Sequence, residues 1–127
     1  MILAKTRRDL IVNADDFGRS RGINRGVIHC HDHGIVTSAS LMTLWPASRE
    51  AATAAAARPR LSLGLHLDLG EWYCRAGNWE CTYLRVELDD EPAVRAELER
   101  QLRAFRRLVG RDPTHLDSHQ HVHREEP

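Results

Sequence analysis

The sequence LIVNADDFG, residues 10–18, joins a short apolar run to two adjacent carboxylates. The run from Leu10 to Val12 predicts a buried strand that ends just before Asp15 and Asp16. In parallel α/β folds, ligands and chemistry lie at the carboxyl ends of the strands. A bend there would let the two acids serve one site, one holding a metal and the other accepting a proton. Paired acids are also common in plain turns, so the pair alone does not decide between a site and a turn.

Strand and helix patterns alternate along the rest of the chain. Further strands are expected at 35–42, 61–67 and 114–123, and helices at 20–33, 47–57 and 90–109. The last helix has the most regular apolar stripe, formed by Val94, Leu98, Leu102, Phe105 and Val109. This alternation predicts an α/β fold, a parallel sheet wrapped by helices, in one domain spanning residues 1–127.

Charge and apolar content exclude several classes of protein. Basic and acidic residues are equal at 18 each, which argues against nucleic acid as a partner. No apolar run is long enough for a membrane span, and the N-terminus lacks the apolar core of a signal peptide, so we expect a cytoplasmic protein. The three cysteines, Cys30, Cys74 and Cys81, form no disulfide pattern and are expected to be reduced thiols rather than metal ligands.

Segment 68–80 contains aromatic residues between glycines and is expected to be a loop. Trp72, Tyr73 and Trp79 could form a minor hydrophobic cluster beneath that loop, or a surface on which sugar rings stack. The sequence favours neither alternative.

Histidines and acids gather at three expected strand ends. In 114–123, alternate positions are occupied by His115, Asp117, His119, His121 and His123, which a continuous strand would place on one face. His66 lies near the end of strand 61–67, and Asp15 and Asp16 end the first strand. If the strands are parallel, these groups meet at one edge of the sheet. One carboxylate and two imidazoles there would suit a divalent metal, whereas each histidine taken singly could be structural.

Four segments resemble the YdjC-like carbohydrate deacetylases, which include chitooligosaccharide and hopanoid-associated types. They are Val12–Gly18 (VNADDFG), Gly34–Ser38 (GIVTS), Gly64–Leu67 (GLHL) and Thr114–His123 (THLDSHQHVH). The segments occur in the same order along nearly the whole chain, and the first and last are the most specific.

The resemblance implies a (β/α) barrel, of which this chain would be the N-terminal half. It implies a divalent metal, zinc or magnesium by expectation, and removal of acetyl groups from N-acetylated carbohydrates. It further implies Asp16, His66 and His119 as metal ligands and Asp15 as general base. His121 would line the substrate site, although strand parity alone would equally allow it as a ligand.

Two other functions stay open at this stage. The chain could be a catalytically inactive, metal-binding fragment that oligomerises, which a direct assay of these 127 residues would reveal. A phosphodiesterase on the same scaffold is the weaker alternative, because no anion-binding glycine loop is present.

We predict a homodimer or higher oligomer. The first and fourth strands of an open sheet would be unpaired edges with apolar inner side chains, and association with a second copy would cover them. The interface should bury more than about 1,000 Å². Light scattering at micromolar concentration checks this prediction, and a clean monomer would contradict it.

Overall fold

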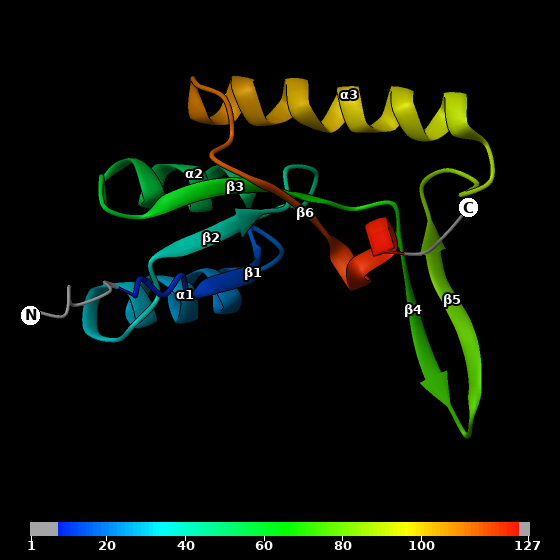
Figure 1. The fold of residues 1–127 in the computed structure, drawn as a ribbon, viewed down its shortest axis with the longest axis horizontal. Coiled ribbons are helices and arrows are strands. Elements are labelled where there is room, and N and C mark those ends of the chain that lie inside the picture. Colours follow the sequence, from blue (N-terminus) through cyan, green and yellow to red (C-terminus); the bar gives the residue numbers. More distant parts are fainter. Residues whose placement is uncertain (1–7, 125–127) are drawn as a thin grey trace, which may run out of the picture.

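The computed structural model describes residues 8–124, which form a four-stranded parallel sheet, helices and a projecting hairpin (Figure 1). In chain order the elements are β1 (Asn13–Phe17), α1 (Arg21–His33), β2 (Ser38–Leu41), α2 (Ser48–Ala56), β3 (Ser62–Leu67), β4 (Gly70–Arg75), β5 (Asn78–Leu84), α3 (Glu91–Val109), β6 (Leu116–Ser118) and the 3-10 segment η1 (His119–Arg124). The parallel sheet has the order β1-β2-β3-β6, and β4 and β5 form a separate two-stranded antiparallel sheet. The predicted parallel α/β fold is therefore confirmed.

One face of the parallel sheet forms the core. Alternate side chains of β2 and β3 point to this face and pack with Phe17, Val27 and Phe105. The buried small residues of α2, such as Ala51 and Ala55, pack in the same cluster. Burial of this apolar face is the main source of stability for such a sheet.

The opposite face of the sheet is polar. Asn13, Ser40 and Asp117 come from three different strands, and their side chains are hydrogen-bonded to one another across this face. The prediction that the inner side chains are apolar is therefore wrong, because serine, glycine and histidine occupy the alternate positions of β2 and β3. The edges are as expected: among the described residues, β1 and β6 each pair with only one neighbour. The dimer stays a prediction that now depends on the edges alone.

The helix ends follow their capping residues. Ser20 Oγ accepts a hydrogen bond from Ile23 N at the start of α1, and Asp90 accepts one from Ala93 N at the start of α3. Gly110 ends α3 in the left-handed conformation, with φ of 79°. All three predicted helices are confirmed within two residues at each end.

The first strand is displaced from its expected position. Leu10 and Ile11 are 79% and 77% exposed, and β1 begins only at Asn13. The strand thus contains the two acids instead of stopping before them. The side chains of β1 that pack in the core are Ala14 and Phe17. The apolar run 10–12 therefore precedes the strand and does not form it.

The expected loop at 68–80 is instead most of the hairpin β4–β5. Ala76 and Gly77 make its tight turn with φ of 50° and 84°, and positive φ at both central positions suits a two-residue hairpin. The turn has no Asn-Gly or Asp-Gly pair, which is the usual sequence signal. The hairpin extends away from the parallel sheet (Figure 1).

The last strand is shorter than its pattern suggested. It ends at Ser118, and Gln120 and His121 have φ of 54° and 59° within η1. Alternation therefore stops at Ser118, and the expected single-face row of five alternate residues is wrong. The side chain of His123 lies outside the described part of the structure.

Two expectations from composition can be compared with the structure. Cys30, Cys74 and Cys81 are free and exposed. Among residues 8–124, no helix combines the length and apolar character needed to cross a bilayer.

Gly18→Ala should destabilise the protein. Gly18 has φ of 95°, and a Cβ there would lie 2.9 Å from Met42 O and 2.9 Å from Leu41 Cδ1. We expect a loss of about 1–3 kcal/mol in the free energy of unfolding, measured by urea denaturation. Gly26→Ala is the matched control, since nothing lies within 4 Å of its Cβ in helix α1. That variant should be neutral or stabilised, and equal losses in both would contradict the argument.

Candidate metal centre

A bulge in β1 sets the position of Asp16. Ala14 pairs with Ala39 and Phe17 with Leu41, so β1 spans three residue steps where β2 spans two. The extra residue is taken up by Asp16, whose φ is 59°. Asp is among the residues that tolerate this left-handed conformation. The bulge directs the Asp16 carboxylate toward the end of the neighbouring strands.

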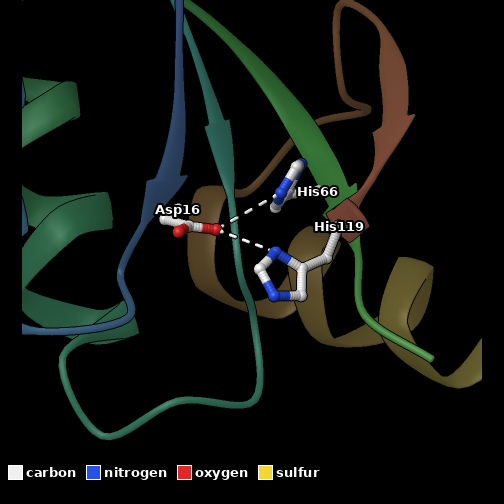
Figure 2. A group of neighbouring side chains, drawn as sticks. All are labelled: Asp16, His66 and His119. Carbon is white, nitrogen blue, oxygen red and sulfur yellow. Dashed lines mark ion pairs between the residues drawn. The ribbon is translucent and has the colours of Figure 1, made fainter. Parts of the chain in front are cut away.

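Two histidines face one oxygen of Asp16 (Figure 2). Asp16 Oδ1 lies 3.4 Å from His66 Nε2 and 3.1 Å from His119 Nδ1. His66 comes from the end of β3 and His119 directly follows β6. One ligand atom from each of the three residues lies within 4.8 Å of the other two. The structure thus brings together the three residues that the family resemblance implies as ligands.

The unsatisfied atoms of this cluster fit a cation. Asp16 Oδ1 and His119 Nε2 are buried and have no hydrogen-bond partner among residues 8–124. A buried carboxylate oxygen without a donor is costly unless a cation or a proton compensates it. One carboxylate oxygen and two imidazole nitrogens are ligands common to zinc and several other divalent metals. The residues present therefore fit a divalent metal ion.

The far nitrogen of His66 is fixed by a carboxylate. His66 Nδ1 lies 2.7 Å from Asp117 Oδ1, while Asp117 Oδ2 accepts a 2.6 Å hydrogen bond from Ser40 Oγ. Asn13 Nδ2 also donates to Ser40 Oγ at 2.8 Å. A carboxylate on the far ring nitrogen holds a ligating histidine in one tautomer and orientation. His66 is therefore preorganised to present Nε2 to the centre.

The same contacts shift the pKa values of the cluster. Burial by itself lowers the pKa of His66, but the contacts with Asp117 and Asp16 outweigh it and raise the pKa to about 9. The imidazoles of His119 and His66 hold the pKa of Asp16 far below its usual value. Burial raises the pKa of Asp117, but the hydrogen bonds from His66 and Ser40 outweigh this effect and lower it.

The other residues put forward from the sequence lie around the cluster. Asp15 is exposed, and its Oδ1 accepts a 2.8 Å hydrogen bond from Asn13. A ligand atom of Asp15 lies within 4.8 Å of His66 and Asp117 ligand atoms. His121 is exposed in η1, close along the chain to His119. His115 lies further back on the polar face, with Nε2 3.1 Å from Ser40 Oγ.

Sequence reasoning missed two charged residues beside the cluster. Arg19 Nη1 lies 3.3 Å from Asp16 Oδ2, and its Nη2 donates to both carboxylate oxygens of Glu71 at 2.7 Å. Glu71 Oε1 lies 3.9 Å from His119 Nε2. Glu71 lies in the segment 68–80 that the sequence predicts to be a loop, and recognition of β4 as a strand is the signal that would have pointed to it.

The fold and site together define a parallel α/β domain with an Asp-His-His cluster at its strand ends. A family model described as YdjC-like protein matches residues 9–127. The chain therefore belongs to the YdjC-like family, as the sequence motifs implied.

Several curated relatives are named deacetylases. The carbohydrate deacetylase of Halalkalibacterium halodurans is 39% identical over 93% of this chain and 55% of that protein. The chitooligosaccharide deacetylase of Proteus mirabilis is 38% identical over 90% of this chain and 49% of that protein. The chain thus spans about half the length of these relatives.

A solved structure has the same fold. It belongs to a candidate cellobiose-phosphate cleavage protein of Enterococcus faecalis, with a TM-score of 0.77 and 29% identity. The match covers 95% of this chain and 52% of that one.

We expect metal-free protein to lose stability as the pH rises from about 6.5 to about 9. The folded state raises the pKa of His66 to about 9, so its contribution is complete below the unfolded value near 6.5 and disappears above the folded one. The free energy of unfolding should fall by up to roughly 3 kcal/mol, measured by urea denaturation in chelator. Asp117→Asn should reduce this slope, and Asp112→Asn, which alters an exposed residue, should keep it. A flat profile in the unsubstituted protein would contradict the assignment.

Proposed function

We propose that this chain takes part in metal-dependent deacetylation of N-acetylated carbohydrates. The observation that carries the proposal is the convergence of Asp16, His66 and His119 in a member of a family with curated deacetylases. Asp16 Oδ1, His66 Nε2 and His119 Nδ1 would hold a divalent ion, zinc or magnesium. Such an ion lowers the pKa of water and stabilises the negative charge that develops on the acetamide oxygen.

Asp15 is the proposed general base. Its carboxylate projects from the strand that carries Asp16, and the hydrogen bond from Asn13 restricts its orientation. It is exposed, so it can reach a water molecule that attacks the acetamide carbonyl and accept its proton. The adjacent acids would then divide the work, Asp16 as ligand and Asp15 as base.

An aromatic groove supports a sugar substrate. Trp72, Trp79, Leu88, Gln120 and Val122 line a hollow between the hairpin and η1. Trp79 is 72% exposed, which leaves its ring available for stacking on a pyranose. Gln120 follows His119 in the chain, so the lining of the groove includes the neighbour of one cluster residue. His121, also in η1, is proposed to contact the substrate and is a candidate to protonate the leaving amine.

The architecture supports assignment to half of a (β/α) barrel. The sheet order follows the chain order, and α1, α2 and α3 contact β1, β2 and β3 respectively. In a barrel of this kind, catalytic groups gather at the carboxyl ends of the strands, as Asp16, His66 and His119 do here. An inactive, metal-binding form that oligomerises is the alternative, supported by the open outer edges that β1 and β6 have among the described residues.

Asp15→Asn should slow acetate release from N-acetylglucosamine oligomers by about 10²–10⁴-fold. The reason is that the amide cannot accept the proton of the attacking water, whereas the metal ligands stay in place. Release of acetate by the metal-loaded chain is measured with a coupled assay, and metal binding is measured alongside.

Asp112→Asn serves as the control, because Asp112 is exposed and its side chain pairs with Arg106 on the surface. A rate within about threefold of the unsubstituted chain for Asp15→Asn would exclude it as general base. A chain that binds metal but releases no acetate would favour the inactive alternative.

A further inference from the structure

We propose that Glu71 and Arg19 form a positioning pair for the metal ligands His119 and Asp16. The inference rests on the proposed function, since it assumes that these residues hold a divalent ion. Neither residue belongs to a segment that carried the family resemblance, and both lie beside the cluster (Figure 2 shows the cluster itself).

The orientation of the His119 ring points to Glu71. Nδ1 of this ring faces Asp16 at 3.1 Å, so the opposite nitrogen, Nε2, is directed away from the cluster. That nitrogen is buried, in a residue only 7% exposed, and has no hydrogen bond within the described part of the chain. Glu71 Oε1 lies 3.9 Å from it. Ligating histidines almost always donate the other N–H to a carboxylate, carbonyl or water. We therefore infer that Glu71 accepts the N–H of His119 in the metal-bound protein, in the same way that Asp117 pairs with the far nitrogen of His66.

The present distance is too long for a hydrogen bond, which ends near 3.2 Å for N–H···O. A shift of under 1 Å between Glu71 and His119 would form it. When Nδ1 binds a metal, the proton of the neutral ring must be on Nε2. Metal binding therefore makes Nε2 a donor, from which Glu71 can accept a hydrogen bond. We therefore expect the contact to shorten when the ion binds.

Arg19 links Glu71 to the carboxylate ligand. It donates to both oxygens of Glu71 and reaches Asp16 Oδ2 at 3.3 Å. Its guanidinium also lies 5.1 Å from the centre of the Trp45 ring, which supports it from one side. Contact with Oδ2 leaves Oδ1 directed toward the two histidines. Arg19 thus orients one ligand directly and a second through Glu71.

The hairpin holds Glu71 at a defined place relative to His119. Gln120 donates from Nε2 to Trp72 O at 2.6 Å and accepts from Trp72 N at 2.8 Å. Trp72 follows Glu71, and Gln120 follows His119, so these two hydrogen bonds join the neighbours of the two residues. An ion pair that only attached the hairpin to the sheet would affect folding but would have no specific effect on metal binding.

The test measures metal affinity directly. Zn²⁺ is titrated into the chain in competition with a chromophoric chelator, for the unsubstituted chain, Glu71→Gln and Glu71→Ala. We expect dissociation constants raised about 10–100-fold in both variants. The thermal unfolding midpoints of the two Glu71 variants, measured in chelator, should match the midpoint of the control variant Glu80→Gln. Arg19→Lys, which keeps the charge but loses the bidentate geometry, should fall between the unsubstituted chain and Glu71→Ala.

Glu80→Gln is the matched control on the same hairpin. Glu80 is exposed on β5 and accepts a hydrogen bond from Tyr73. The metal affinity of the Glu80→Gln variant should equal that of the unsubstituted chain. Glu71 variants that bind Zn²⁺ within twofold of this control would overturn the inference while leaving the proposed function intact. Weaker binding that only accompanies a lower midpoint in chelator would also overturn it. Absence of Zn²⁺ binding in the unsubstituted chain would overturn the proposed function as well.

Discussion

The bulge at Asp16 is the constraint on which the site depends. Ala14 and Phe17 both pack in the core although they are three residues apart, and a regular strand would place them on opposite faces. The positive φ of Asp16 resolves this conflict at a cost of about 1–3 kcal/mol. The same backbone turn directs its carboxylate toward the histidines. Core packing and ligand orientation are thus satisfied by one local distortion.

Hydrogen bonds on the polar face of the sheet orient a second residue of the cluster, His66. Asn13, Ser40 and Asp117 form a hydrogen-bonded chain across the strands that ends on His66. Gly64 contributes by its lack of a side chain, because a Cβ there would lie 2.3 Å from the His115 ring. Helices therefore stabilise one side of the sheet, while hydrogen bonds among polar groups arrange the other side. This division explains how a small domain can keep charged groups ordered in a partly exposed site.

The sequence predicted the elements whose signals are local. Ser20, Asp90 and Gly110 mark helix ends, and these are as expected because caps act within a few residues. That the acids and histidines at the strand ends meet was also predictable, since parallel strands put their carboxyl ends at one edge. The choice of Asp16 and His119 among them came from the family resemblance, because strand parity alone would equally allow His121.

The structural features that the sequence did not predict depend on non-local packing. The hairpin turn at Ala76-Gly77 lacks a typical turn pair, and the end of β6 at Ser118 has no breaker residue. Two of the proposed ligands, Asp16 and His66, lie in strands of the sheet, whereas His119 lies in irregular backbone beside the positive φ of Gln120. The least constrained of the proposed ligands, His119, is therefore the one that lies next to the hairpin, through the Gln120–Trp72 hydrogen bonds and Glu71. Because the hairpin also carries Trp72 and Trp79, one element reaches both the metal centre and the proposed sugar groove.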